Sequence, residues 1–159
     1  NIAFIKNKIS EAGVIYAPAK KKIYFSDLEN KAYEIEFSHD VEKVPFQNKR
    51  QISVNPISKN PLTVTISRSH NNKKTDEFLK NYNIKNTIIT GSSIKFCLIA
   101  SGIAELYPRL GPTREWDVAA GHAILKAAGG NVRIMDKSEL QYGKEEENFL
   151  NPDFIATNF

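Results

Sequence analysis

Short apolar runs separated by polar turns dominate the first third of the chain. Residues 2–5, 10–16, 21–26 and 31–37 are rich in β-branched and aromatic side chains, a composition typical of strands. Polar clusters such as Asp27-Leu28-Glu29-Asn30 lie between them and indicate turns. We therefore predict antiparallel strands, with residues 18–22 as a connection. For the polar, proline-dotted residues 38–60 we predict a loop with at most short structure.

After residue 61 the pattern changes to strands that alternate with helices. The sequence predicts strands at residues 62–67, 86–90, 104–107, 132–135 and 154–157. It predicts helices at residues 75–81, from 91–93 to about 101, and at 115–128, where Gly129-Gly130 ends the last one. Such alternation favours an α/β layer. We predict two parts: residues 1–60, the remainder of an N-terminal antiparallel-sheet subdomain, and residues 61–159, a C-terminal α/β subdomain.

Composition and charge narrow the classes of partner. The chain has 159 residues and a formal net charge of +4, an excess that suits an anionic small molecule at least as well as nucleic acid. Its basic residues do not alternate with exposed aromatics as a single-strand groove requires, so we predict no nucleic-acid partner. The single cysteine, Cys97, lies in an apolar run and indicates a buried structural thiol in a reducing compartment.

No stretch of the sequence reaches the roughly 18 apolar residues of a membrane span. We therefore predict a cytoplasmic protein. A homodimer and peripheral association with the inner membrane are left open by the sequence.

The segment from Trp116 to Gly130 carries the most chemistry. Its apolar and small residues fall on one helical stripe: Trp116, Ala120, Ala123, Ile124 and Ala127. Asp117 lies in the first turn, where free N–H groups and the positive end of the helix dipole favour anions. That carboxylate either complements the helix alone or holds a hard cation that in turn binds a phosphate. The residues alone leave both interpretations open.

Gly91-Ser92-Ser93 opens the helix before it. Glycine permits close approach of the backbone to a ligand, and hydroxyls at a helix start can donate to phosphate oxygens. Ser92 and Lys95 are three residues apart and share a helix face. The same pattern also fits an ordinary N-cap.

Two further segments follow strands. Ser67-Arg68-Ser69-His70 comes directly after a predicted buried strand, and Arg109 follows another. A solvated strand end and a surface arginine are the ordinary interpretations. If the segments converge, they form a small cationic pocket suited to two phosphates on one ligand, from Arg68, His70, Lys95 and Arg109.

The pattern W-D-x-A-A-G-x-x-I-L-x-x-A-G-G at residues 116–130 is similar to the second signature of the inositol-monophosphatase superfamily. The segments G-S-S-x-K-F, S-R-S-H and Y-x-R, together with stretches near residues 1–5, 13–18 and 149–154, resemble its bacterial bisphosphate nucleotidase branch. The resemblance implies a layered α+β, sugar-phosphatase-like fold. It implies that Asp117 is a catalytic residue and a Mg²⁺ ligand. It also implies substrate contacts from Ser67, Arg68, Ser69, His70, Gly91, Ser92, Ser93, Lys95, Arg109 and Asp117.

The function implied by the resemblance is magnesium-dependent removal of the 3′-phosphate of adenosine 3′,5′-bisphosphate, a small-molecule substrate, to give AMP and phosphate. An inositol or sugar phosphate phosphatase is the alternative within the superfamily, and a non-enzymatic nucleotide-binding module is the alternative of another class. The superfamily's first signature, D-P-x-D-G-T, and an earlier pair of glutamates are absent from the sequence. We therefore expect that the N-terminus is missing and that these residues alone are inactive.

Overall fold

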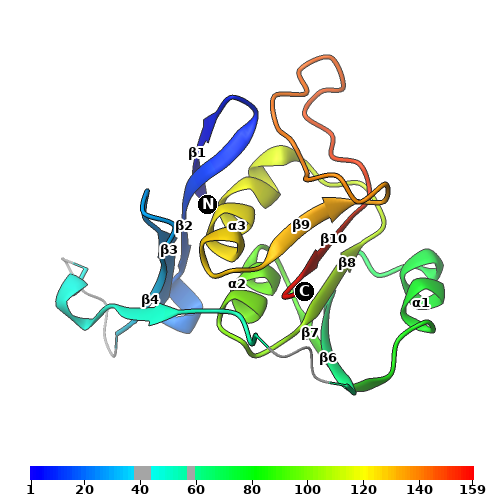
Figure 1. Ribbon diagram of the computed structural model, residues 1–159, viewed down its shortest axis with the longest axis horizontal. Coiled ribbons are helices and arrows are strands. Elements are labelled where there is room, and N and C mark those ends of the chain that lie inside the picture. The colour runs from blue at the N-terminus through cyan, green and yellow to red at the C-terminus, as the bar shows by residue number, and fades with distance from the viewer. Residues whose placement is uncertain (38–43, 57–59) are drawn as a thin grey trace.

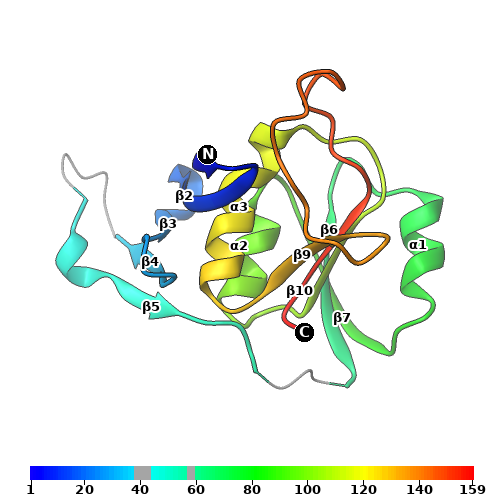
Figure 2. The same cartoon turned by 45° about the horizontal axis from the view of Figure 1, so that its top comes forward.

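The computed structural model describes residues 1–37, 44–56 and 60–159. Within them the chain forms two five-stranded sheets with helices between and beside them. Figure 1 shows helices α2 and α3 in the layer between the two sheets, and α1 on the far side of the second sheet. The layers are therefore sheet, helices, sheet, helix, as the turned view in Figure 2 also shows.

The first sheet is an antiparallel meander in chain order. Its strands are β1 (Ile2–Lys6), β2 (Ile9–Ala17), β3 (Lys22–Ser26), β4 (Ala32–Glu36) and β5 (Arg50–Ile52). Short 3₁₀ turns at Pro18–Lys20 and Phe46–Asn48 lie between strands. β5 is the short structure in the polar stretch 38–60, of which residues 38–43 and 57–59 lie outside the described residues.

The second sheet is mixed, in the order β7-β6-β8-β10-β9. Its strands are β6 (Leu62–Ser67), β7 (Ile84–Thr90), β8 (Leu106–Arg109), β9 (Asn131–Ile134) and β10 (Phe154–Thr157). β6 pairs in parallel with both β7 and β8, while β10 runs antiparallel to β8 and β9. The carboxyl ends of three neighbouring parallel strands therefore meet at one edge of this sheet.

Three α-helices complete the described part of the fold: α1 (Lys73–Leu79), α2 (Ile94–Ala100) and α3 (Glu115–Ala127). α2 and α3 contribute nine of the 22 buried residues of the main core, which they share with residues from both sheets. A smaller apolar cluster around Leu62, Val64 and Leu106 takes the side chains of Phe78 and Leu79 from α1.

Two glycines permit close packing around α3. A Cβ at Gly13 on β2 would lie 2.8 Å from Cα of Ala120, and one at Gly121 would lie 2.9 Å from Cβ of Phe96 on α2. Both distances are shorter than real Cβ contacts allow. The absence of a side chain at these positions lets α3 lie directly against the first sheet on one side and α2 on another.

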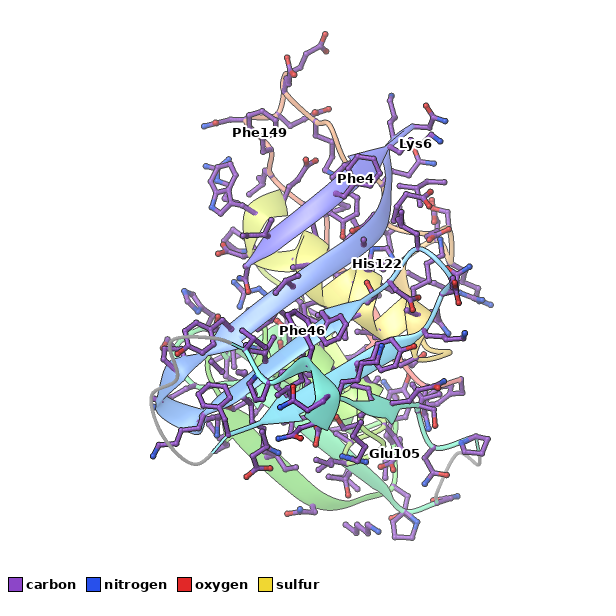
Figure 3. The ribbon with its side chains drawn as sticks, turned by 90° about the vertical axis from the view of Figure 1, so that its left-hand side faces the viewer. Phe4, Lys6, Phe46, Glu105, His122 and Phe149 are labelled. Atoms are coloured by element: carbon purple, nitrogen blue, oxygen red, sulfur yellow. The ribbon has the colours of Figure 1, made fainter. Side chains whose placement is uncertain are left out.

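The face of the first sheet turned away from α3 is partly exposed. Phe4 and Phe46 lie on the side of this sheet that faces the viewer in Figure 3, with His122 of α3 behind it. Their exposed fractions are 54% and 59%. On the inner face, Ser10 instead donates to the carbonyl of Ala119 at 2.8 Å and fixes the sheet to α3.

The predicted α/β fold class, with an antiparallel portion before it, is confirmed. The strand predicted at residues 154–157 has the same bounds as β10. The helix predicted from residue 75 instead begins at Lys73, because the side chain of Asn72 accepts from the backbone N–H of Thr75 and caps it earlier. The strand predicted at 104–107 lies two residues later, at β8.

Other expectations concern individual residues. Cys97 is buried as predicted, and burial raises the pKa of its thiol. Trp116, which we placed on the packed stripe of the last helix, is 58% exposed and packs against Phe149 at a centroid distance of 5.9 Å. In the part of the chain that the structure describes, no helix is long and apolar enough to cross a membrane. The division into two subdomains at residue 60 stays a prediction.

Candidate active site

A pocket of about 140 Å³ opens at the carboxyl ends of the parallel strands of the second sheet. Such strand ends are the usual position of ligand sites in α/β folds, because loops from neighbouring strands meet there. The pocket lies between the ends of β6 and β8, the loop after β7 and the first turn of α3. Its lining consists of Ser67, His70, Ser92, Lys95, Phe96, Tyr107, Arg109, Thr113, Asp117 and Val118.

Two buried cations are the main charged groups of this pocket. Lys95 and Arg109 are 3% and 7% exposed. Lys95 donates to the carbonyl of Ser92 at 2.6 Å, and Arg109 donates to the carbonyl of Pro112. Among the described residues neither of them forms an ion pair with a carboxylate. The pocket therefore holds two positive charges that are free to pair with an anion.

The electrostatics of the pair agree with this arrangement. Burial, and to a smaller extent the positive charge of Arg109, lowers the pKa of Lys95 to about 8. Nε of Arg109 is buried and has no hydrogen-bond partner within the described part of the chain. An anion in the pocket would satisfy that donor and relieve the repulsion between the two cations.

Asp117 brings a carboxylate to the same pocket. It lies in the first turn of α3, and its side chain is exposed. One carboxylate is a poor Mg²⁺ site by itself, because magnesium needs several oxygen ligands. Across the described residues no group of three or more His, Cys, Asp or Glu is placed to hold a metal ion. The donor set found here therefore does not fit a complete metal site, although Asp117 can supply one ligand.

The segment from Ser67 to His70, which begins at the last residue of β6, contributes two of its four predicted residues. Ser67 and His70 line the pocket, with Oγ of Ser67 3.4 Å from Nδ1 of His70. The backbone N–H of His70 also donates to that hydroxyl at 3.2 Å, which keeps the two side chains together. Arg68 and Ser69 are exposed and do not line the pocket.

The Gly91–Ser93 turn contributes Ser92 alone. The backbone of Ser92 is in the left-handed region, with φ at 55°, an unusual conformation for a residue other than glycine. Ser93 is buried and donates to Oδ1 of Asn1 at 2.7 Å, so it ties the turn to the start of β1. Gly91 does not line the pocket and has open space where a Cβ would be.

The structure adds lining residues that the sequence did not single out. Thr113 lies in the loop between β8 and α3, and its carbonyl accepts from the backbone N–H of Asn151 at 2.9 Å. Thr113 carries a hydroxyl directly after the turn-forming Gly111-Pro112, and this sequence feature could have predicted a residue of the pocket. Tyr107 and Phe96 lie in the same sequence segments as Arg109 and Lys95, which the sequence analysis singled out. Both aromatic residues line the pocket. Contact of any of these residues with a substrate stays a prediction.

Comparison with known proteins defines the class to which this fold and pocket belong. Residues 1–158 match the model of a protein family described as the inositol monophosphatase family. The chain belongs to the inositol monophosphatase family.

Several of its curated relatives carry the name of a bacterial nucleotidase. The chain is 42% identical over 157 residues to the 3'(2'),5'-bisphosphate nucleotidase CysQ of Salmonella typhimurium, covering 99% of this chain and 58% of that protein. It is 39% identical to the protein of the same name from Buchnera aphidicola, covering 99% of this chain and 56% of the relative. The chain thus spans little more than half the length of these relatives.

Solved structures agree with the family. The crystal structure of CysQ from Bacteroides thetaiotaomicron is similar with a TM-score of 0.83 and 35% identity, over 99% of this chain and 61% of that one. The IMPase of Thermotoga maritima has a TM-score of 0.73 at 20% identity, over 98% of this chain and 54% of that one. The second likeness shows the fold alone.

Proposed function

We propose that this chain forms the substrate-binding part of a magnesium-dependent phosphatase that removes the 3′-phosphate of adenosine 3′,5′-bisphosphate. The products are AMP and inorganic phosphate. The observation that carries the proposal is the pair of buried cations, Lys95 and Arg109, in the same pocket as Asp117. The names of the Salmonella and Buchnera relatives, 3'(2'),5'-bisphosphate nucleotidases, support the choice of a bisphosphate nucleotide.

In this proposal the pocket residues bind and orient the phosphates. Lys95 and Arg109 neutralise the phosphate charge, and the hydroxyls of Ser67 and Ser92 donate to phosphate oxygens. His70 contacts the nucleotide without acting as a base. Arg68, Ser69, Gly91 and Ser93, also implied by the resemblance, act through the backbone and the shape of the loops.

Asp117 supplies one ligand to Mg²⁺. Because the remaining ligands are not among the described residues, we expect little or no turnover from these 159 residues alone. We propose a cytoplasmic protein for this small-molecule substrate. A homodimer and contact with the inner membrane surface are not needed for the activity proposed.

An inositol or sugar phosphate phosphatase is the second candidate, since the inositol monophosphatase of Anabaena shares the fold. The test measures phosphate release in the presence of Mg²⁺ from adenosine 3′,5′-bisphosphate and from an inositol phosphate. The protein is a chimera in which the part of the Salmonella relative that this chain does not match is joined to the 159 residues. The chain alone and the Asp117→Asn chimera serve as controls.

We expect release that prefers the nucleotide, collapses in the Asp117→Asn chimera and is absent from the chain alone. Preference for the inositol phosphate would support the second candidate. Binding of the nucleotide without release would support a non-enzymatic nucleotide-binding module. Strong magnesium-dependent turnover by the chain alone would contradict the need for further ligands.

A further inference from the structure

Lys95 brings an amine to the pocket and holds it at a defined place. The residue is 3% exposed and lines the same pocket of about 140 Å³ as Arg109. Its Nζ donates to the carbonyl of Ser92 at 2.6 Å and lies 5.0 Å from the centroid of the Tyr107 ring. In the described ranges no carboxylate forms an ion pair with this amine. The amine is therefore fixed at the pocket without a negative partner that would hold it in the charged form.

This amine is also neutral more often than that of an ordinary lysine. Burial, and to a smaller extent the charge of Arg109, lowers the pKa of Lys95 to about 8. At pH 7 about 10% of the molecules then carry the neutral amine, against about 0.04% for a lysine with the ordinary pKa of about 10.4. Only the neutral form has the lone pair that attacks an electrophile. Lys95 is therefore a nucleophile at neutral pH.

Arg109 supplies the means to hold a phosphate group in the same pocket. Its guanidinium donates to the carbonyl of Pro112, while its buried Nε has no hydrogen-bond partner in the part of the chain that the structure describes. Phosphate oxygens are strong acceptors for such a donor. The pocket has room for several water molecules, and thus for a phosphate with a short organic group attached. A phosphate bound by Arg109 in so small a space places that organic group near the amine of Lys95.

We propose that Lys95 is a modification site for small acyl phosphates, which acylate its amine while Arg109 holds their phosphate group. The lone pair of Nζ forms a bond to the acyl carbon, and the bond between that carbon and the bridging oxygen breaks. Inorganic phosphate leaves with the electron pair of the broken bond and takes up the proton that the amine loses. The product is a neutral amide, so the pocket loses one of its two positive charges.

This reactivity goes beyond the proposed function, because it needs a pocket that accepts a phosphate group but no phosphatase activity. The modification would also act on that function. A chain acylated at Lys95 keeps Arg109 as the cation of the pocket, and we expect it to bind anions less tightly than the unmodified chain.

The test treats the 159-residue chain with acetyl phosphate at pH 7 and follows the acetylation of each lysine by peptide mass spectrometry. Lys85 and Lys137 are exposed and serve as internal references. The neutral fractions above differ by about 250-fold. A less basic amine is a weaker nucleophile, and a bound phosphate favours the charged amine, so both effects reduce that difference. We expect Lys95 to react at least about tenfold faster than either reference.

An uncharged acetylating reagent, N-hydroxysuccinimidyl acetate, is the matched control for recognition of the phosphate. Arg109→Gln should slow the reaction of Lys95 with acetyl phosphate by about tenfold more than its reaction with the uncharged ester, because the variant loses a charge-assisted contact with the phosphate. Melting temperatures show whether the variant is folded. Sulfate provides a second measurement on the unaltered chain: it should protect Lys95 and leave Lys85 unaffected, compared with sodium chloride at the same ionic strength.

A rate for Lys95 no higher than that of Lys85 and Lys137 would overturn the proposal and leave the proposed function untouched. Equal slowing of both reagents in a folded Arg109→Gln variant would overturn the role of Arg109, since it would show that the arginine affects only the amine. Failure of sulfate to protect Lys95 would overturn the recognition of phosphate, whichever way the variant behaves.

Discussion

Anion binding in the pocket should depend on pH through the charge of Lys95. The pKa of this buried lysine is lowered to about 8, first by burial and then by Arg109. The charged form of a lysine predominates only below its pKa. With a pKa of about 8, Lys95 is about 90% protonated at pH 7 and about 10% protonated at pH 9. The loss of charge with rising pH should therefore weaken the binding of an anion.

The size of the effect follows from the geometry of a direct contact. Two unit charges about 4 Å apart interact by about 4 kcal/mol at an effective dielectric constant of about 20. The neutral amine therefore contributes little to binding, and affinity should follow the protonated fraction. We expect about tenfold weaker binding at pH 9 than at pH 7.

Calorimetric titration of the chain with sulfate between pH 7 and pH 9 measures this effect, because the two negative charges of sulfate do not change over that range. Lys95→Arg is the matched control, since a guanidinium stays protonated throughout. We expect a flat profile for Lys95→Arg and a falling one for the unaltered chain. Profiles equally steep in both proteins would refute the assignment to Lys95, and a flat profile in the unaltered chain would show that its pKa lies well above 8.

Three further predictions concern the fold around the pocket. Gly121→Ala should lower the free energy of unfolding by about 1–3 kcal/mol in urea titrations, because the new methyl group would overlap Phe96; an unchanged midpoint would contradict the packing described. Burial raises the pKa of Glu115, but its hydrogen bonds, first from the Lys144 side chain, outweigh that effect and hold the pKa below the ordinary 4.5. The unaltered chain should therefore be more stable than Glu115→Gln by the full amount at neutral pH, and this advantage should disappear as the pH falls below 4.5. A difference in the free energy of unfolding that persists at about pH 2.5 would show that the ionised carboxylate is not its cause. Cys97 should react with a thiol reagent far more slowly in the folded chain than in denaturant, because it is buried and its pKa is raised; equal rates would show that α2 opens readily.

Local pattern determined most of the secondary structure. The alternating apolar runs gave the meander of the first sheet, and the bounds of β10 agree to the residue. Helix α3 follows from its own stripe of small residues and from the two glycines that end it. These features depend on neighbours within a few residues, so the sequence alone is sufficient to predict them.

Capping and exposure were harder to predict from the same pattern. Asn72 starts α1 earlier than its apolar residues suggest, because its side chain bonds to Thr75 and also to the carbonyl of Leu110 in another loop. Trp116 has the spacing of a core residue yet stays exposed beside Phe149. Helical spacing defines a face, but it does not say how far the neighbouring layers extend over that face.

What the sequence by itself determined is the set of segments that carry polar groups at the ends of strands and at the start of α3. Only the tertiary structure decided which of those groups meet. Because β6 pairs in parallel with both β7 and β8, three strand ends lie side by side, and Ser67, Ser92 and Arg109 converge with Asp117. Each of those segments also has residues that point elsewhere, and strand order and side-chain direction depend on contacts between residues far apart in the chain. The contact of Lys95 with the Tyr107 ring is likewise a product of the packing of β8 against α2 and β10.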